Sequence, residues 1–448
     1  MDDTSTLDIL AGLQRTGIRP GLSRIRRLVT RLGHPERAFP AVLISGTNGK
    51  GSTAAFLDAI LRSAGHRTGR FTSPHLVDVR ERIAIDGRWI DAETFSALAR
   101  EVRDVMAAGA RPVRATYFEA LTAIGFLAFA RARVDVAVVE VGMGGRFDST
   151  NVCDPLASVL TNVTLDHVAY LGPTVDAIAA EKVGVARPGR PFVTAVEDGV
   201  FDRVVGPALQ AMGATAWRLG RDGTVTRRPD GRIDFASGGL PRQPHGNGAG
   251  RTDDPIDLAA GALRLDGLGV GLPGAFQADN AALAIVAAQA LDAAGIRVPA
   301  DAIRAGVASA SWPGRLQRVH DRPAVILDGC HNPGAAERLA QALDSDPLPR
   351  PLVMVHGSRP DKDYPAVLRL LVPRVDAVIE TGIPGLSPPD EVAAQARLVA
   401  AGRVPVTTEP DLRAALTHAM HLAGPAGTVL VTGSLYLVGA ALASQTWR

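Results

Sequence analysis

The chain has 448 residues, of which 46% are hydrophobic and 21% are charged, and its formal net charge is +2. This length and composition are typical of a globular protein with two or three domains. This net charge argues neither for nor against acidic partners, and the lack of a continuous basic stripe disfavours nucleic-acid binding. Two cysteines, Cys153 and Cys330, are too few for a disulfide framework and favour a reducing cytoplasm. The most apolar stretch, around residues 121–130, is too short to span a bilayer, so we expect a cytoplasmic protein without a membrane partner.

Short runs rich in valine and isoleucine alternate along the chain with longer segments of helical period. This alternation predicts an α/β fold, in which parallel sheets are covered by helices on both faces. Helices of the first part are expected at residues 52–65 and 94–109. Buried strands of the first part are expected at residues 41–45, 134–142, 156–163 and 191–196.

A second α/β alternation follows in the last third of the chain. Before it, the segment 220–256 is dense in glycine, proline and aspartate, which predicts a hairpin or a mobile surface insertion. Helical patterning stops at the sequence WPG near residue 312, so we expect one domain at 1–309 and another at 310–448. The strands of the second domain are expected at residues 324–329, 351–357, 376–382, 404–409 and 428–434.

The first predicted strand leads into a glycine-rich turn, GTNGKGS, and then into a helix. Only three of the 48 lysine and arginine residues are lysines, and one of them, Lys50, lies in this turn. Backbone N–H groups at a helix start bind anions, and glycines let the backbone wrap around phosphate oxygens. The strict G-x-x-x-x-G-K-[ST] pattern is not matched, because Ile44 takes its first glycine position and Gly51 separates Lys50 from Ser52. The strand and helix flanks favour nucleoside triphosphate binding over a glycine turn without a ligand.

Polar residues follow three predicted strands of the first domain. Glu140 ends an otherwise apolar strand, where a buried carboxylate is costly unless it meets a cation. His167 and Ser73 occupy the corresponding exits of other strands. Because ligands of doubly wound sheets bind beyond the carboxyl ends of strands, the three groups predict a Mg²⁺ site beside the phosphates. An arginine partner for Glu140 and a structural role for His167 are the alternatives.

The segment GMGGRFD, residues 142–148, has the glycine spacing of a weak dinucleotide fingerprint. The polar loop RFDSTNVCDP follows it, whereas a pyrophosphate turn requires a helix there. A nicotinamide-dependent oxidoreductase is therefore disfavoured.

Ten motifs occur in order over nearly the whole chain: GTNGKGS, FTSPHL, TYFEALTAIGF, EVGMGGRFDSTN, TLDHVAYLG, AEKVGV, GAFQADNAALA, WPGRLQ, DGCHNP and VLVTGSLYLV. This series resembles the folylpolyglutamate synthase and dihydrofolate synthase family of the Mur ligase superfamily. The resemblance implies a central ATPase domain with a phosphate loop and a mostly parallel sheet, and a smaller C-terminal Rossmann-like domain.

The resemblance also implies an activity, that of an ATP-dependent amide ligase. Such an enzyme couples L-glutamate to dihydropteroate or a folate through an acyl phosphate and releases ADP and phosphate. The implied partners are small-molecule substrates, with two Mg²⁺ ions as cofactors, and the family suggests a monomer.

Family roles carry over to the positions that match. Lys182 matches a lysine that reacts with CO₂ to give a carbamate near the second metal, and the implied catalytic residues are Lys50, Lys182 and His167. The implied metal ligands are Ser73, Glu140 and His167. The nucleotide-binding residues are Asn48, Gly49, Lys50, Gly51, Ser52, Asn280, Arg315 and Asp328, the last two reaching ATP across the domain junction. The substrate-binding residues are Thr116, Tyr117, Phe118, Glu119, Phe147, Asp148, Ser149 and His331.

Three positions depart from the family pattern or stay open. Cys330 stands where alanine is usual, and a packing role is expected for it. Leu386 takes the place of an expected arginine, which puts the glutamate end of the pocket in doubt. Lys362 lies in the family's DKD stretch, and a purely structural ion pair is the alternative role for it. A Mur-type ligase with another carboxylate acceptor, and a nucleotide-gated regulatory protein that needs only the phosphate loop, are the alternative functions.

Overall fold

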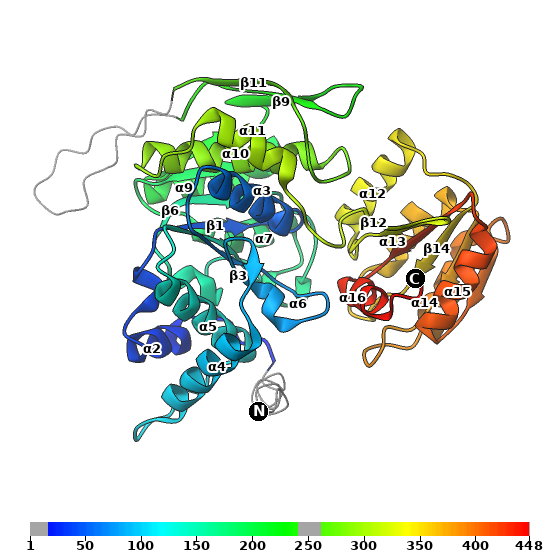
Figure 1. Ribbon diagram of the computed structural model, residues 1–448, viewed down its shortest axis with the longest axis horizontal. Helices are drawn as coiled ribbons and strands as arrows, with labels where there is room; N and C mark the ends of the chain where they lie inside the picture. Colours follow the sequence, from blue (N-terminus) through cyan, green and yellow to red (C-terminus); the bar gives the residue numbers. More distant parts are fainter. Residues whose placement is uncertain (1–16, 241–260, 448) are drawn as a thin grey trace, which may run out of the picture. The chain divides into compact units, whose positions relative to one another are not determined.

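A computed structural model describes residues 17–240 and 261–447, and the chain divides into two compact units (Figure 1). The first unit comprises residues 1–73, 80–271 and 277–311. The second comprises residues 74–79, 272–276 and 312–448, so two short segments from the first part of the chain pack with the C-terminal part. Among the described residues, no helix combines the length and apolarity that crossing a membrane requires.

An eight-stranded sheet forms the centre of the first unit, with the strand order β4-β3-β2-β5-β1-β6-β7-β8. The six strands from β2 to β8 in that order are parallel, whereas β3 and β4 continue the edge in antiparallel fashion. The predicted strands of the first part are confirmed. The strand bounds are β1 Ala41–Ser45, β2 Thr68–Phe71, β3 Ile83–Ile85, β4 Arg88–Trp89, β5 Val136–Glu140, β6 Pro155–Leu160, β7 Pro191–Thr194 and β8 Thr215–Arg218.

Helices cover both faces of this sheet, as the alternation of apolar runs and helical segments predicts (Figure 1). On one face, α3 (Lys50–Ser63) packs against α10 (Gln277–Ala293) and α11 (Ala300–Ser309). The other face carries α2 (Ser23–Arg31), α4 (Ala92–Ala107) and α5 (Tyr117–Ala132). Shorter helices lie in the connections: α6 Val168–Leu171, α7 Val175–Lys182, α8 Asp198–Val200, α9 Gly206–Met212, the 3₁₀ turns η1 Pro35–Arg37, η2 Val79–Arg82, η3 Ser149–Val152 and η4 Val183–Val185, and the π-helical turn η5 Phe201–Val205.

A small antiparallel sheet accompanies the first unit. It consists of β9 (Gly223–Arg227), β10 (Ile233–Ser237) and β11 (Leu263–Leu268) in the order β11-β10-β9. Strands β9 and β10 form the hairpin that the composition of 220–256 predicts, and the later part of that segment, from residue 241, lies outside the described residues.

The second unit is a separate α/β sandwich. Its six-stranded sheet has the order β12-β13-β17-β14-β15-β16, with all pairs parallel except β12 with β13. Two apolar clusters, one containing Met354 and the other Val355, pack on opposite faces because successive strand residues alternate. The strands are β12 Gln317–Asp321, β13 Ala324–Leu327, β14 Leu352–His356, β15 Ala377–Glu380, β16 Val406–Thr408 and β17 Thr428–Thr432, and the helices are α12 Pro333–Ser345, α13 Tyr364–Leu371, η6 Val372–Arg374, α14 Asp390–Ala400, α15 Leu412–Ala423 and α16 Leu435–Ser444.

A buried ion pair links α3 to β2 in the first unit. Asp58 of α3 is fully buried and accepts a 3.0 Å hydrogen bond from Nη1 of Arg70, which lies on β2. The same carboxylate accepts a 2.6 Å bond from the hydroxyl of Thr68. Burial lowers the pKa of Arg70, and the charge of Asp58 opposes that shift. The pair therefore stabilises the contact between helix and sheet only while both partners are present.

We expect Asp58→Ala to cost about 3–5 kcal/mol of unfolding free energy, because it removes the carboxylate that accepts a hydrogen bond from the buried Arg70 guanidinium. Denaturant unfolding followed by circular dichroism measures this loss. The matched control is Asp176→Ala, which breaks the exposed pair with Arg203, where solvent screens the attraction and little change is expected. Equal losses of unfolding free energy in the two variants would contradict the stabilising role of the buried pair between Asp58 and Arg70.

Candidate nucleotide and metal site

The turn between β1 and α3 is an anion-binding cradle at the carboxyl edge of the sheet. Helix α3 begins at Lys50, and its N-cap Gly49 has φ of 86°, a left-handed conformation that glycine adopts without strain. The N–H of Thr47 donates to the Asn162 carbonyl at 2.9 Å, and the N–H of Asn48 donates to Asn162 Oδ1 at 3.0 Å. The segment after β6 thus fixes the turn in place, at a helix start of the kind that binds anions.

Helix α10 touches this turn at Asn280. A Cβ atom added to Gly49 would lie 2.4 Å from Asn280 Oδ1, so a side chain there would displace the Asn280 amide. The Asn280 amide donates to Gln277 Oε1 at 2.8 Å, and its oxygen lies 3.5 Å from the Thr53 hydroxyl. The structure therefore brings the predicted nucleotide residue Asn280 to the turn, although the two are far apart in sequence.

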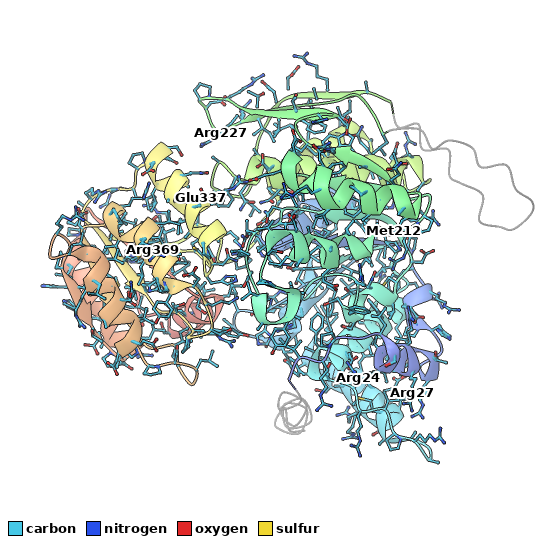
Figure 2. The ribbon with its side chains drawn as sticks, turned by 180° about the vertical axis from the view of Figure 1, so that it is seen from behind. Arg24, Arg27, Met212, Arg227, Glu337 and Arg369 are labelled. Carbon is cyan, nitrogen blue, oxygen red and sulfur yellow. The ribbon has the colours of Figure 1, made fainter. Side chains whose placement is uncertain are left out.

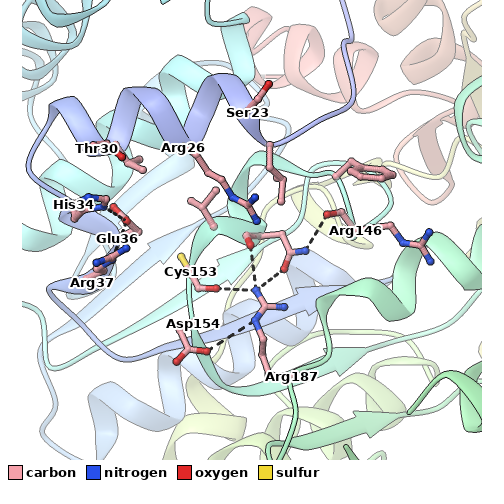
Figure 3. A pocket seen from close by; sticks show the side chains of 15 residues that line it. Ser23, Arg26, Thr30, His34, Glu36, Arg37, Arg146, Cys153, Asp154 and Arg187 are labelled. Carbon is pink, nitrogen blue, oxygen red and sulfur yellow. Dashed lines mark hydrogen bonds and ion pairs between the residues drawn. The ribbon is translucent and has the colours of Figure 1, made fainter. Parts of the chain in front are cut away.

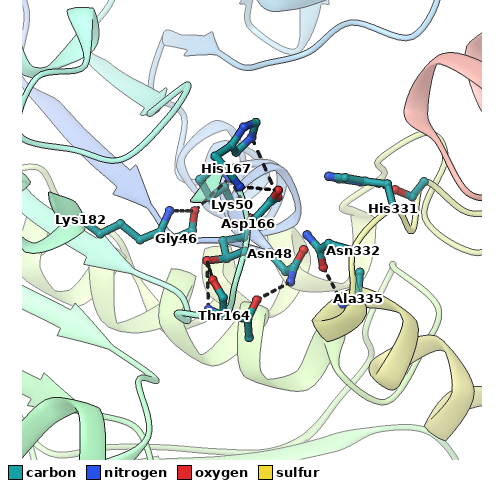
Figure 4. A network of polar contacts seen from close by, with 12 residues as sticks. Gly46, Asn48, Lys50, Thr164, Asp166, His167, Lys182, His331, Asn332 and Ala335 are labelled. Atoms are coloured by element: carbon teal, nitrogen blue, oxygen red, sulfur yellow. Dashed lines mark hydrogen bonds and ion pairs between the residues drawn. The ribbon is translucent and has the colours of Figure 1, made fainter. Parts of the chain in front are cut away.

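Two of the three lysines converge on one carbonyl oxygen of the turn (Figure 4). Lys50 Nζ donates to the carbonyls of Gly46 and Thr47, each at 3.1 Å. Lys182, the last residue of α7, donates from Nζ to the same Gly46 carbonyl at 2.7 Å. Lys182 is only 4% exposed, and burial together with the nearby charge of Lys50 lowers its pKa to about 7. Its amine is therefore largely uncharged just above neutral pH.

Glu140 and Ser73 also meet at this edge of the sheet. Glu140 ends β5, beside Ile44 of β1, and is 4% exposed. One of its oxygens, Oε2, accepts a 3.1 Å hydrogen bond from the Ser73 N–H. Magnesium commonly takes one or two protein carboxylates and completes its octahedron with waters and phosphate oxygens, so these oxygen donors fit a divalent cation.

His167 lies in the segment that follows β6, as expected, and Figure 4 shows it near Lys50 and Asp166. Strand β6 ends at Leu160, and His167 is the left-handed residue, with φ of 51°, that precedes α6. Its side chain is 39% exposed, and its Nε2 lies 4.0 Å from Asp166 Oδ2. Within residues 17–240 and 261–447, no three histidine, cysteine, aspartate or glutamate side chains form a metal-binding group. The role of His167 as a ligand stays a prediction.

The predicted substrate residues of α5 also have a structural task that the sequence reading did not include. Thr116 is the N-cap of α5 and forms a reciprocal capping box with Glu119. Glu119 Oε2 also accepts from Arg24 Nε at 3.1 Å. The second oxygen, Oε1, is buried and has no hydrogen-bond partner among the described residues, so one acceptor remains for a ligand. Next to them, the Tyr117 ring lies 5.9 Å from the Arg82 guanidinium.

The loop after β5 carries the other predicted substrate residues. Phe118 packs against Gly142 so closely that a Cβ there would lie 2.4 Å from its ring. Asp148 accepts hydrogen bonds from the N–H groups of Met143 and Thr150, and burial raises the pKa of Asp148. Ser149 shares a 2.7 Å hydrogen bond with Thr122, while Phe147 is 48% exposed. Asp148 thus shapes the loop, and Phe147 offers an apolar face.

In the second unit, Asp328 organises the turn after β13. Its oxygens accept from the N–H groups of Leu316 and Cys330, at 3.0 and 2.9 Å. Burial raises the pKa of Asp328, and the charge of Arg315 opposes the shift. His331 Nδ1 lies 2.9 Å from the Gly329 carbonyl. Burial raises the pKa of the Cys330 thiol well above its usual range, which fits the packing role predicted for it.

Two other predicted positions of the second unit are surface features. Leu386 is 51% exposed and lies in the turn that a backbone bond between Ile383 and Ser387 closes. Lys362 is half-buried in the loop before α13, and its N–H donates to the Arg359 carbonyl at 3.2 Å.

Sequence reasoning missed the residues that hold the phosphate turn from outside. Thr161 Oγ1 donates to the Asn48 carbonyl at 2.6 Å, and Asn162 and Thr164 add further bonds. The sequence TNVT, which follows the apolar strand β6, could have indicated these residues. Strand β6 pairs with β1, and the glycine-rich turn follows β1 at the same edge of the sheet.

Comparison with known proteins identifies the class of protein to which this chain belongs. The Mur ligase middle domain matches residues 44–198, and the Mur ligase glutamate ligase domain matches residues 314–435. The site and the two sheets are thus those of a Mur ligase. The "Dihydrofolate synthase/folylpolyglutamate synthase" of Mycobacterium tuberculosis is 37% identical over 464 residues, which cover 95% of this chain and 90% of the relative. The chain belongs to the folylpolyglutamate synthase and dihydrofolate synthase family, and it is an ATP-dependent ligase.

Solved structures agree with this assignment. "E. coli FolC in complex with DHPP and ADP" has a TM-score of 0.85 and 30% identity, covering 99% of this chain and 97% of that one. The bifunctional folylpolyglutamate synthase/dihydrofolate synthase of Yersinia pestis, complexed with AMPPNP and Mn ion, has a TM-score of 0.80 and 29% identity, covering 99% and 98%. The chain spans only about half, 51%, of a Haloferax volcanii relative, a "Probable bifunctional folylpolyglutamate synthase/dihydropteroate synthase" that is 37% identical to it over 450 residues.

We expect Gly49→Ala to weaken ADP binding by at least about tenfold, because its methyl group collides with Asn280 and displaces the turn. The control is Gly65→Ala, just beyond α3, where φ is 88° and no atom lies within 4 Å of the added carbon. Both variants carry a similar backbone strain of about 1–2 kcal/mol. Calorimetric titration with ADP compares the two variants. Equal ADP affinities of Gly49→Ala and Gly65→Ala would contradict the role of the contact between Gly49 and Asn280.

Proposed function

We propose that this protein adds L-glutamate to dihydropteroate or a (tetrahydro)folate, with cleavage of ATP to ADP and phosphate. The observation that carries the proposal is the convergence of Lys50 and Lys182 on the Gly46 carbonyl, beside a helix start. Relatives that bear the names of both synthases, and the FolC structure with DHPP and ADP, support the choice of substrates.

In the proposed reaction, a carboxylate oxygen of the acceptor attacks the γ-phosphorus of ATP and ADP leaves. The glutamate amine then attacks the acyl carbon, loses a proton and displaces phosphate, so that an amide forms. The N-terminus of α3 and Lys50 bind the triphosphate and offset the charge of the transferring phosphoryl group. Because an acyl phosphate hydrolyses in water, the buried surroundings of Lys182 and Glu140 suit this chemistry.

A divalent cation is part of the proposal. Glu140 and Ser73 would hold it, with His167 as the third predicted ligand, and the Yersinia pestis structure with Mn ion supports a metal beside the nucleotide. When bound, the cation neutralises charge on the triphosphate. We also propose a second ion, next to a carbamate on Lys182.

The environment of Lys182 supports this modification. A carbamate forms when a neutral amine attacks the carbon of CO₂, a C–N bond replaces one C=O π bond, and a proton leaves. The pKa of Lys182 is lowered to about 7, so the neutral fraction rises as the pH increases through that value. An arginine cannot perform this step, which gives a reason for a lysine in a chain with only three of them.

We expect Lys182→Arg to retain ATP binding but lose about 10- to 100-fold in metal affinity and turnover, the usual cost of removing a group that supports a metal. In the wild type, ¹³C-bicarbonate should give a carbamate NMR signal that strengthens from pH 6 to pH 8. The signal should persist in Lys362→Arg, which leaves Lys182 intact, and vanish in Lys182→Arg. Near wild-type turnover of Lys182→Arg would exclude the carbamate role.

The remaining predicted residues complete the proposal. We assign the acceptor to Thr116–Glu119 and to the loop with Phe147, Asp148 and Ser149, where Glu119 Oε1 is a free acceptor among the described residues. Asn48, Gly51, Ser52 and Asn280 are assigned to ATP within the domain at 1–309. Arg315, Asp328 and His331 belong to the domain at 310–448 and are assigned to ATP and substrate. We propose that the enzyme is a monomer in the cytoplasm.

A Mur-type ligase with a different carboxylate acceptor is the second candidate. Two observations favour it: Leu386 replaces the expected arginine, and the capping box of α5 already engages Thr116 and Glu119. Both would weaken recognition of the family's own substrates.

Mass spectrometry of the products decides between the two candidates. With ATP, Mg²⁺ and glutamate, dihydropteroate should gain one glutamyl residue, and tetrahydrofolate one or more if the chain also extends folates. ADP should form in a one-to-one ratio with the new amide. If neither acceptor gains mass while ADP binding is intact, the family acceptor is wrong and the second candidate stands.

A further inference from the structure

The glycine-rich segment after β5, residues 142–145, packs against the end of helix α7. The φ of Gly145 lies outside the left-handed region, so its backbone conformation is open to any residue. Space is what requires a glycine there, because an added Cβ would lie 2.6 Å from the carbonyl oxygen of Lys182 and 2.8 Å from that of Glu181. The loop backbone thus lies directly against the last turn of α7, and a side chain at position 145 would push Lys182 away.

The contact between this loop and α7 is reciprocal. A Cβ added to Gly184, which follows α7, would lie 2.6 Å from the Cβ of Arg146 and 2.7 Å from its Cα. In the same contact, the N–H of Arg146 donates to the Glu181 carbonyl at 2.9 Å. This carbonyl belongs to the last turn of α7, where the helix offers it no N–H of its own. The loop therefore caps α7, and the two glycines give the two backbones the space to meet.

Two side chains hold the same loop from other directions. Asn151 Nδ2 donates to the Arg146 carbonyl at 3.1 Å (Figure 3) and to the Gly184 carbonyl at the same distance. Ser45 Oγ donates to the Gly144 carbonyl at 2.8 Å, and Ser45 ends β1 directly before the phosphate turn. The loop that caps α7 is therefore also fixed to the strand that leads into the turn.

These contacts form a closed ring that includes both ends of Lys182. Its backbone meets Gly145, and its Nζ donates to the carbonyl of Gly46, the residue after Ser45, at 2.7 Å (Figure 4). Lys182 is buried along this path, and burial together with the charge of Lys50 lowers the pKa of its amine to about 7. A displacement of the α7 end would carry the amine out of these surroundings.

We propose that Gly145 and Gly184 are positioning residues for Lys182. By letting the loop and α7 touch, they place the Lys182 amine against the Gly46 carbonyl at the phosphate turn. This positioning role rests on the proposed function only in its effect on turnover, because the placement of the amine can be measured without substrates.

The scarcity of lysine allows a direct test by NMR. The full chain, grown with lysine that carries ¹³C at Cε, gives three lysine signals, and Lys182→Arg and Lys362→Arg assign two of them. In buffer free of nucleotide and CO₂ the amine is unmodified, so the pH dependence of the Cε chemical shift gives the pKa of Lys182. We expect about 7 in the wild type and about 8 or higher in Gly145→Ala, because a displaced amine regains solvent and approaches its ordinary value of 10.5.

The control is Gly213→Ala, directly after Met212 at the end of α9 (Figure 2). The left-handed φ of 65° strains an alanine there, whereas the added carbon meets no atom within 4 Å, so this variant loses stability without touching Lys182. The pKa of Lys182 should stay about 7 in it. A milder variant, Asn151→Ala, removes the bridge without a steric clash and should raise the pKa of Lys182, and melting temperatures show which variants are folded.

Two results would overturn the positioning role: a Lys182 pKa that stays about 7 in every folded variant of the contact, and a rise in Gly213→Ala equal to that in Gly145→Ala. Turnover separates this role from the proposed function. If Lys182 acts in the reaction, Gly145→Ala should lose about 10- to 100-fold in turnover, the cost of a small misplacement. Wild-type turnover together with a raised pKa would support the positioning role and reject the catalytic role of Lys182.

Discussion

The site depends on one constraint, the confinement of two lysine side chains against a single backbone carbonyl, that of Gly46. Burial and the charge of Lys50 favour the uncharged amine of Lys182, and the turn that holds both lysines is fixed by its neighbours. Asn162 and Thr161 bind the turn from the neighbouring strand exit, and Asn280 fills the space above Gly49. In the proposed function this fixed turn binds the triphosphate, whose negative charge suits the two lysines.

The parallel sheet explains why residues so distant in sequence meet there. Strands β1, β5 and β6 are neighbours in register, so the residues at their carboxyl ends emerge at one edge. Glu140 lies directly beside the end of β1, and the polar run after β6 lies on its other side. The position of the site follows from the order of three strands, and helices α3 and α10 then orient the backbone around it.

Much of this was accessible from the sequence. The apolar runs predicted β1, β5, β6 and β7 of the eight-stranded sheet and all strands of the six-stranded sheet except β12, because a strand buried on both faces leaves a continuous valine and isoleucine signature. They did not predict β2, β3, β4 and β8, which are short and lack such a run. The scarcity of lysine pointed to Lys50 and Lys182 before any contact was known. The capping box of Thr116 and Glu119 was also predictable, because a threonine followed three residues later by a glutamate is a capping signal. Both residues were predicted only as substrate-binding residues.

The rest could not be predicted because it depends on tertiary contacts without a local pattern. Nothing near Gly49 indicates that Asn280 occupies the space where its side chain would lie. The placement of His167 before α6 follows from a loop whose length the apolar pattern does not fix.

The distribution of amines has a practical consequence for chemical labelling. A chain with three lysine side chains offers acylating reagents very few targets, and two of these targets lie at the phosphate turn. An uncharged amine is the nucleophilic form, so Lys182 is intrinsically reactive near neutral pH but shielded by its burial. Reagents small enough to enter would thus modify the turn between β1 and α3, with Lys362 as the other lysine target. If this turn binds the nucleotide, as proposed above, the nucleotide would protect its two lysines from the reagent.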